Sequence, residues 1–303
     1  MAAILGLWRK REFIFCLSLV TGLLFGHVAV YTKVLVLPVL GLIMTVSISG
    51  IRGGILRSAG GFARPALAGL GMSYGVLGLL ILALSALLIR DPDIRAGFIM
   101  VAAIPPGVGI IPFTQILKGN VAFSMIGTIA GYLGALVLTP LIAVAFLGAS
   151  FVEPTRLLVV LVELIVIPLI VARILVRAGL DERIEPARGA ITNWGFFLVI
   201  YTSIGLNRDV FLGEPQTLLP AAAVAVALTF GLGWGIELVC RRRHVDPGTI
   251  LSFVLLGTMK NFGLAAGLAI SFFNNRTAIA PAIVTAVSIV YLVWLMMRAR
   301  RRG

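Results

Sequence analysis

The sequence predicts an all-α integral membrane protein with ten transmembrane helices, arranged as two inverted five-helix repeats whose fourth and ninth helices are broken and cross near the midplane. Three observations lead to this fold class. The 303 residues are 60% hydrophobic and 12% charged, with a mean hydropathy of +1.09, well outside the range of soluble globular domains. Apolar stretches of the roughly 20 residues that a helix needs to cross a bilayer recur along the chain. Two of them are interrupted by proline, glycine and lysine.

The ten apolar stretches are separated by short polar breaks with turn chemistry, such as Arg-Asp-Pro-Asp at 90–93 and Asp-Pro-Gly at 246–248. We interpret 1–303 as a single transmembrane domain, with a first repeat over 1–148 and a second over 149–303. The predicted spans are 12–32, 34–51, 65–89, 97–117, 120–148, 156–178, 192–212, 217–239, 248–273 and 278–297.

The first stretch begins with basic residues, as a signal peptide does. Its length, and the apolar stretch that follows at once, favour an uncleaved first span. Cys16 and Cys240 are far apart in sequence and suggest neither a disulfide framework nor a metal site, so we expect both to be packing residues.

The basic residues predict the orientation in the membrane. With ten spans, 18 of the 25 lysines and arginines fall on the side of the two termini, 6 fall on the other side, and Lys260 lies within a span. Because cytoplasmic loops carry the excess of positive charge, both termini are expected in the cytoplasm of a multi-pass plasma (inner) membrane protein. The net charge of +13 is explained by this distribution and does not point to nucleic acid.

The fourth stretch, 97–120, cannot form one regular helix. Proline lacks a backbone donor and frees carbonyls in the preceding turn, and inside a membrane these groups must find partners in protein or in a wet cavity. The interrupting residues are Pro105, Pro106, Gly107, Gly109 and Pro112.

The ninth stretch, 248–273, holds Lys260 and Asn261 between Gly257 and Gly263. An ammonium at this depth costs at least about 2.5–3.5 kcal/mol on insertion scales, so it needs carbonyl or carboxylate partners.

The two interrupted stretches are five spans apart, so two five-span halves would have opposite orientations and their interruptions would meet near the midplane. This pattern is typical of a secondary transporter with inverted repeats and broken helices. The simpler alternative is a proline kink in one span and a lysine that extends to the interface in the other.

Two segments carry a family resemblance: PPGVGIIPFTQILKGNVAFSMIGTIAGYLGALVLTPLI (105–142) and GTMKNFGLAAGLA (257–269). They resemble the bile acid:sodium symporter family in their Pro-Gly-rich break, Gly-Asn-Val-Ala turn and Asn-x-Gly-Leu-Ala run. The resemblance implies a panel domain and a core domain built from inverted repeats, with substrate bound beside the crossing helices and sodium-driven uptake of organic anions in many members.

The resemblance also places the family's sodium ligands, and several are replaced in this chain. The family typically has a serine and an asparagine where this chain has Ile110 and Ile111, and hydroxyls remain at Ser124 and Thr128. The family's glutamate falls on Leu256 and its glutamine on Lys260, and a third-span glutamine would lie near Ser73 or Tyr74.

We therefore expect the Lys260 ammonium to replace the sodium cluster, held by unwound carbonyls and by the hydroxyls of Ser124 and Thr128. A lysine that keeps its proton would give a uniporter or an anion exchanger, and a lysine that releases it would couple proton and anion binding. Ordinary sodium-coupled symport is the alternative within this class. A receptor or sensor that binds a ligand without moving it is the alternative from another class.

The expected partners are a small organic anion, a proton in preference to sodium, and the lipid bilayer, with no cofactor, no metal site and no enzymatic constellation. Glu163 is a further ion-coupling candidate beside Lys260, Ser124 and Thr128, because it lies inside the sixth span. We expect Asn120 to cap the fifth span. The expected substrate and crossover residues are Lys260, Asn261, Gly263, Pro106, Gly107, Val108, Gly109, Ile111 and Pro112.

Overall fold

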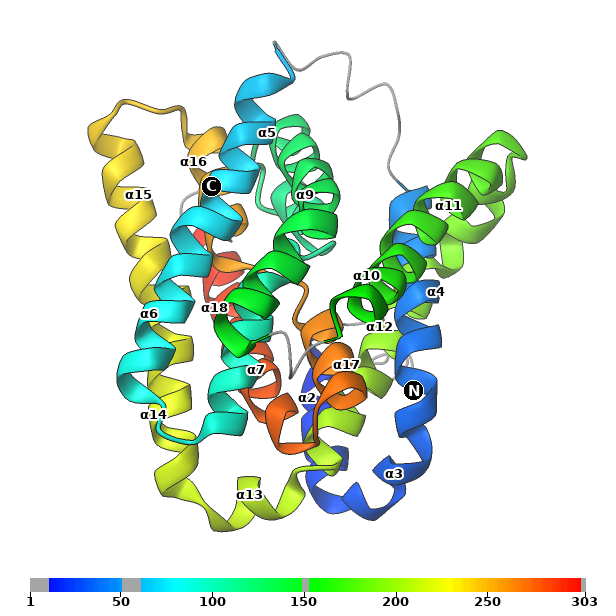
Figure 1. Ribbon diagram of the computed structural model, residues 1–303. Helices are drawn as coiled ribbons and strands as arrows, with labels where there is room; N and C mark the ends of the chain where they lie inside the picture. Colours follow the sequence, from blue (N-terminus) through cyan, green and yellow to red (C-terminus); the bar gives the residue numbers. More distant parts are fainter. Residues whose placement is uncertain (1–10, 51–60, 149–152, 301–303) are drawn as a thin grey trace.

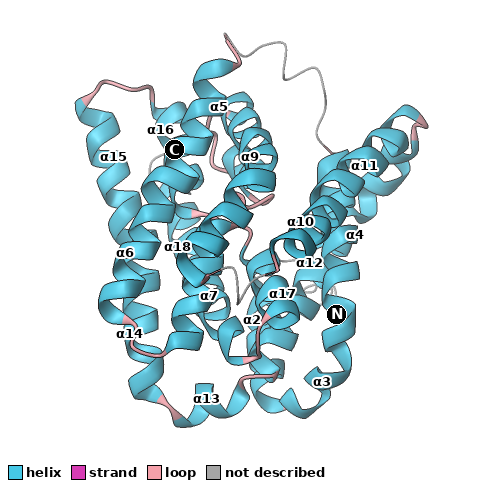
Figure 2. Cartoon of the chain, in the orientation of Figure 1, coloured by secondary structure: helices cyan, strands magenta, loops and turns pink. Residues whose placement is uncertain are grey.

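The computed structural model describes residues 11–50, 61–148 and 153–300, and these form helices joined by short turns (Figures 1 and 2). Six helical stretches among them are long and apolar enough to cross a membrane, and shorter apolar helices accompany them at Phe13–Leu24, Pro247–Thr258 and Phe262–Phe272. The chain is therefore a multi-pass membrane protein. The predicted repeat boundary at 148/149 adjoins residues 149–152, and several of the basic residues used for orientation also lie outside the described residues.

A smaller helix group forms one side of the molecule. Within it α12 packs against α2 and α4, and α11 packs against α4. α10 continues into α11 through a π-helical turn at Val162–Val166. The members of this group are α2 (Arg11–Leu24), α3 (Ala29–Thr32), α4 (Val36–Ser49), α10 (Pro154–Leu161), α11 (Ile167–Arg177) and α12 (Leu180–Gly205).

A larger helix group forms the other side, with α5 against α9, α14 against α18 and α15 against α16 (Figure 1). The short helix α13 (Arg208–Gly213) leads into it from α12. Its members are α5 (Ala63–Leu70), α6 (Leu79–Leu88), α7 (Pro92–Ala103), α8 (Ile110–Ile116), α9 (Val121–Leu147), α14 (Pro215–Val226), α15 (Leu232–Arg242), α16 (Pro247–Thr258), α17 (Phe262–Phe272) and α18 (Ile279–Arg300).

Helix starts in the larger group carry side-chain caps. Asp91 accepts hydrogen bonds from the backbone N–H groups of Asp93 and Ile94 at the start of α7. Asn120 accepts one from the N–H of Phe123 at 3.1 Å, which confirms the predicted cap of the fifth span. The Asn120 amide also donates to the Thr249 hydroxyl at 3.0 Å, so this turn ties the start of α9 to the start of α16.

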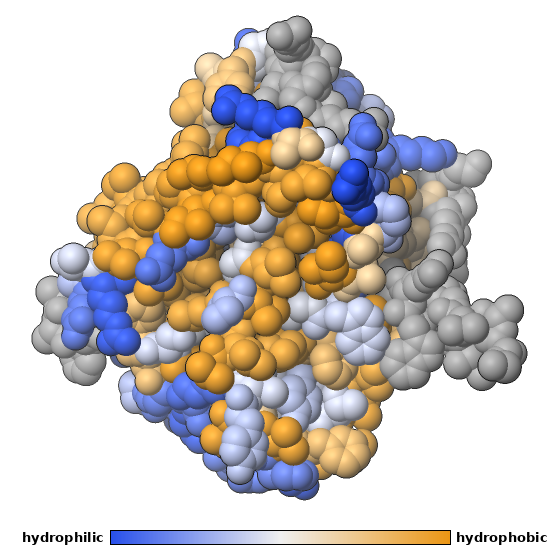
Figure 3. Space-filling view, turned by 90° about the vertical axis from the view of Figure 1, so that its right-hand side faces the viewer, coloured by the Kyte–Doolittle hydropathy of each residue, from blue (hydrophilic) through white to orange (hydrophobic). Residues whose placement is uncertain are grey.

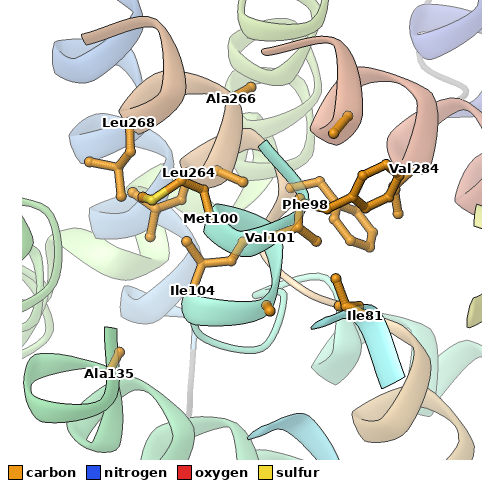
Figure 4. Packing of buried hydrophobic residues seen from close by; sticks show 14 of the residues in the cluster. Ile81, Phe98, Met100, Val101, Ile104, Ala135, Leu264, Ala266, Leu268 and Val284 are labelled. Carbon is orange, nitrogen blue, oxygen red and sulfur yellow. The ribbon is translucent and has the colours of Figure 1, made fainter. Parts of the chain in front are cut away.

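The second half of α7 lies at the centre of the larger group, and its residues 97–103 are apolar and buried. Phe98 and Met100 are fully buried, as is Ile104 directly after the helix, as expected for a segment surrounded by protein. In Figure 4, Met100 lies next to Leu264 of α17, and Phe98 lies next to Val284 of α18. This packing holds the end of α7 in place, close to the break that follows it.

Large apolar side chains also cover the outside of the molecule, among them Leu87 on α6 and Ile170 and Ile174 on α11. Figure 3 shows one face with a broad field of apolar side chains and hydrophilic residues gathered toward its edges. So much exposed apolar surface is not stable in water, and contact with lipid explains it.

Ion pairs tie the helix ends together. Arg276, before α18, binds Asp91 at the start of α7 and Glu214 before α14, each at 2.7 Å. The hydrogen bond from Arg276 lowers the pKa of Glu214 below its ordinary value. For Asp91, burial opposes ionisation, but hydrogen bonds from Arg276 and the backbone outweigh it and lower the pKa.

Candidate functional site

The two breaks predicted from the sequence meet in space. α7 ends before residues 104–109, α16 ends before residues 259–261, and the two segments form an isolated antiparallel bridge between Pro106 and Lys260. Backbone groups that a broken helix leaves free are thus satisfied across the break, as hydrocarbon surroundings require. The backbone bonds run from the N–H of Gly107 to the carbonyl of Met259 (3.3 Å) and from the N–H of Asn261 to the carbonyl of Pro105 (2.9 Å).

Lys260 lies at the centre of this crossing and is 2% exposed. Its Nζ donates to the carbonyl oxygens of Ala102 at 2.8 Å and Ile104 at 2.7 Å, at the C-terminal end of α7. The nitrogen also lies 4.1 Å from the centre of the Tyr74 ring. The freed carbonyls of one broken helix therefore hold the side chain of the other.

These three contacts suit an ammonium rather than a neutral amine. A neutral amine has two N–H groups, and after donating both to carbonyls it would turn its lone pair toward the negative face of the Tyr74 ring. An ammonium directs a third N–H at that face, which is an attractive cation–π contact. The negative end of the α7 dipole adds to the attraction, and no carboxylate pairs with Lys260 among the described residues.

α9 supports the crossing from one side. The Tyr74 hydroxyl donates to the carbonyl of Gly131 at 3.0 Å, and a Cβ at Gly131 would lie 2.4 Å from Cγ of Pro106. The Thr139 hydroxyl donates to the carbonyl of Ala103 at 2.7 Å, so this freed carbonyl of α7 is satisfied as well. Gly131 is required for this close approach because any side chain there would displace the broken segment.

Asn261 caps α17 and contacts a residue that the sequence analysis did not identify. Its oxygen accepts from the N–H of Leu264 at 3.2 Å, and its amide nitrogen donates to the Tyr132 hydroxyl at 3.0 Å. Tyr132 follows Thr128 by four residues, which puts both on one face of α9. This spacing within an otherwise apolar helix was the signal available in the sequence.

The positions where the family resemblance implies sodium ligands have other contacts. Ile110 and Leu256 are completely buried in one apolar cluster. Ser124 accepts a hydrogen bond from Thr114 at 2.8 Å, while Thr128 has no hydrogen-bond partner. The expectation that the Ser124 and Thr128 hydroxyls hold the ammonium is therefore wrong, since two carbonyls and the ring of Tyr74 surround it.

A cavity of about 360 Å³ lies beside the crossing, between the two helix groups. The larger group contributes α8 and α9, and the smaller group contributes α4, α11 and α12. Its walls mix apolar with polar side chains, as small-molecule sites do. The predicted residues that line it are Val108, Gly109, Ile111, Pro112 and Thr128, and its other polar residues are Ser47, Gln115, Tyr132, Arg173, Glu185, Arg188, Thr192 and Asn193.

The remaining predicted residues do not line the cavity. Pro106, Gly107, Lys260 and Asn261 form the crossing behind its wall. Gly263 is buried where α17 meets α12 and α4, since a Cβ there would lie 3.0 Å from the Phe196 ring.

Glu163 is exposed in the π-helical turn between α10 and α11. It lines neither of the two hollows described here and does not contact Lys260. The structure therefore does not bring these two ion-coupling candidates together.

A larger hollow of about 1020 Å³ lies elsewhere, between α15, α16 and α18, and includes the exposed ring of Trp234. None of the crossing residues lines it. The smaller cavity is therefore the candidate site, because it alone of the two is lined by residues of a break, Val108 and Gly109.

Comparison with known proteins gives a family match over nearly the whole chain. Residues 21–299 match the SBF-like CPA transporter family. A probable sodium/metabolite cotransporter of Arabidopsis thaliana chloroplasts, BASS1, is 25% identical over 84% of this chain and 62% of its own length. An uncharacterized sodium-dependent transporter of Bacillus subtilis, YocS, is 25% identical over 69% of this chain and 65% of its own length.

A shorter match is to sodium/bile acid cotransporter 7 of Xenopus tropicalis, 33% identical over 35% of this chain and 32% of the relative. The chain thus spans less than two thirds of the length of the first two relatives.

Proposed function

Because the chain belongs to the SBF-like CPA transporter family, we propose that it is a secondary transporter that moves a small organic anion across the membrane by alternating access. The observation that carries this proposal is the cavity beside two crossed helix breaks, with a buried lysine at the crossing. A substrate in this cavity would contact both helix groups, so a movement of one group against the other would change its access.

The proposal includes two inverted repeats over 1–148 and 149–303. α7 and α8 then make up the fourth span, α16 and α17 make up the ninth, and the discontinuous helices cross near the midplane. Support comes from the corresponding positions of the two breaks, five spans apart, and from their mutual hydrogen bonds. The smaller helix group corresponds to the panel domain and the larger group to the core domain that the resemblance implies.

We place the protein in a plasma membrane with both termini in the cytoplasm, as the lysine and arginine distribution predicts. Arg173 and Arg188 line the cavity and belong to the side with the excess of basic residues. We infer from this orientation that the cavity opens toward the cytoplasm, as in an inward-facing state.

We further propose that Lys260 supplies the positive charge that sodium supplies in the resembling family. The Lys260 nitrogen has two carbonyl acceptors and an aromatic face, and apolar residues occupy three of the ligand positions, Ile110, Ile111 and Leu256. The two hydrogen bonds and the cation–π contact of Nζ support a charged lysine in this state, and hence uniport or anion exchange. Proton coupling would require that the contacts of Lys260 change in the outward-facing state.

Sodium-coupled symport is the second candidate, because relatives are named as sodium-dependent or sodium/metabolite cotransporters. The two candidates differ in one measurement: uptake of small carboxylates into proteoliposomes under an imposed sodium gradient, an imposed pH gradient, or neither.

If Lys260 replaces sodium, uptake proceeds equally well when potassium or choline replaces sodium. Acceleration by an inward proton gradient would identify proton coupling, and acceleration by an internal unlabelled anion would identify exchange. Strict dependence on sodium would contradict the replacement, and binding without any flux would favour the receptor alternative.

A further inference from the structure

We propose that Arg173 binds the carboxylate of the transported anion, and that the Thr128 hydroxyl in the other helix group bonds to a second oxygen of the same molecule. This inference rests on the proposed transport function, and it assigns the direct anion contact to the smaller helix group rather than to Lys260. Lys260 is buried behind the cavity wall, and its contacts are two carbonyls and a ring.

The charges on the cavity wall single out Arg173. Three charged residues line the cavity: Arg173, Glu185 and Arg188. Arg188 is already bound, since it pairs with Glu185 at 2.8 Å and donates to the Ser49 hydroxyl at 2.9 Å. It also donates to the carbonyl of Val46 near the end of α4, so it has a structural role there.

Arg173 has no ion pair or hydrogen bond among the described side chains. It lies on α11 with Leu169, Ala172 and Val176, which share the cavity-facing stripe of that helix. With Arg188 and Glu185 paired, Arg173 is the uncompensated positive charge of the lining. A guanidinium in this position suits a carboxylate, which it can bind through two parallel hydrogen bonds.

The opposite wall carries an unsatisfied hydroxyl. Thr128 on α9 is 2% exposed, lines the cavity, and its Oγ1 has no hydrogen-bond partner. A buried hydroxyl without a partner is unfavourable, so an oxygen atom of the bound molecule is the natural partner. The amides of Gln115 and Asn193 line the same space. The molecule that fits therefore carries a carboxylate at one end and a hydroxyl or keto oxygen toward Thr128.

The size of the cavity suits a small molecule. Its volume of about 360 Å³ lies near the lower end of the range of ligand pockets. A carboxylate with a short, branched or oxygenated chain fits this space completely, whereas part of a steroid anion would lie outside it.

The test measures binding and flux separately on the purified full chain. Binding is measured by thermal shift with pyruvate, 2-oxoisovalerate, pantoate and taurocholate, and flux by uptake of the labelled compounds into proteoliposomes. The variants are Arg173→Gln and Arg173→Lys, with Arg177→Gln as matched control. Arg177 lies one turn further along α11 and does not line the cavity.

We expect Arg173→Gln to raise about tenfold the Kd and KM of the carboxylate that wild type binds most tightly, because one charge-assisted contact is lost. The Kd and KM of Arg173→Lys should lie between those of wild type and Arg173→Gln. Arg177→Gln stays within about twofold of wild type. Thr128→Val weakens binding of the hydroxy- or oxo-carboxylates by about fivefold, and Thr128→Ser restores it.

Equal effects of the Arg173 and Arg177 substitutions on binding would overturn the inference, as would stabilisation of the wild type by taurocholate but by none of the small carboxylates. Binding that depends on Arg173 without flux would leave the assignment of Arg173 intact and overturn the proposed transport. The two failures are therefore distinguishable.

Discussion

At the scale of residues, the buried lysine is the feature that the sequence shows most directly and the structure explains most fully. A lysine in a membrane span demands partners, and this requirement could be stated from the sequence alone. The identity of the partners could not be predicted from the sequence. Ala102, Ile104 and Tyr74 lie more than 150 residues away from Lys260, and the first two contribute only backbone carbonyls. Backbone carbonyls are present at every position, so no sequence pattern marks the ones that a distant side chain uses.

The role of the Lys260 charge can be separated from its role in packing by the substitution Lys260→Gln. We expect thermal stability within a few degrees of wild type, because the amide can still donate to two carbonyls and the cost of burying a charge is removed. Uptake falls at least about tenfold, because the positive charge at the crossing is lost.

The control is Lys33→Gln, at an exposed lysine outside the site, which should change neither property. Wild-type uptake by Lys260→Gln would show that the charge has no part in transport. A loss of folding would show that the charge is structural.

At the scale of elements, each break pairs free backbone groups with the other. Pro105 and Pro106 predict where α7 must end, and Gly257 to Gly263 predict an interruption between α16 and α17. That the two would meet followed from the count of spans. The exact register, with Pro106 opposite Lys260, depends on the packing of Pro106 on Gly131 of α9 and could not be read from either segment.

Gly131→Ala tests this packing. The new Cβ would lie 2.4 Å from Cγ of Pro106 and displace the crossing segment. We expect a loss of about 1–3 kcal/mol in the free energy of unfolding, measured as a lower midpoint of thermal unfolding in detergent.

The matched control is Gly235→Ala on α15, where a Cβ would meet nothing within 4 Å. Helix propensity predicts a gain of up to about 1 kcal/mol for that variant. Equal stability of the two variants would contradict the close approach at Gly131.

At the scale of the whole molecule, the two helix groups leave a cavity between them, and ion pairs tie helix ends together within the larger group. Arg276 joins the start of α7, the linker before α14 and the segment before α18 through Asp91 and Glu214. The sequence indicated that the charged residues of these loops belong to turns. Their pairing was not predicted, because it joins positions more than 60 residues apart.

The pH dependence of stability follows from these pairs. The pKa values of Glu214 and Asp91 lie below their ordinary 4.5 and 3.8, so both carboxylates stabilise the folded state above those values. This contribution is lost as the pH falls below about 4.5 toward the lower pKa values of the folded state. We expect Arg276→Gln to unfold a few degrees below wild type at pH 7, and this difference to shrink as the pH falls through that window.

Arg90→Gln is the control for that experiment, because Arg90 is exposed beside the same loop and has no ion pair among the described side chains. Its unfolding midpoint should follow wild type at every pH. A difference between Arg276→Gln and wild type that persists unchanged at pH 3 would show that the carboxylates are not its cause.

The sequence by itself determined that this protein crosses the membrane many times, where its helices break, and that a lysine must be held inside it. These properties depend on local composition and on the free energy of placing polar groups in hydrocarbon, which act wherever the residues occur. Only the tertiary structure decided that carbonyls and Tyr74 hold Lys260, that the Thr128 hydroxyl lines a cavity without a hydrogen-bond partner, and that Arg173 of the other helix group lines the same cavity. These contacts depend on which helix faces pack against each other. Because the helix surfaces are almost uniformly apolar, the sequence does not mark the faces that meet, and the packing of side chains distant in sequence selects them.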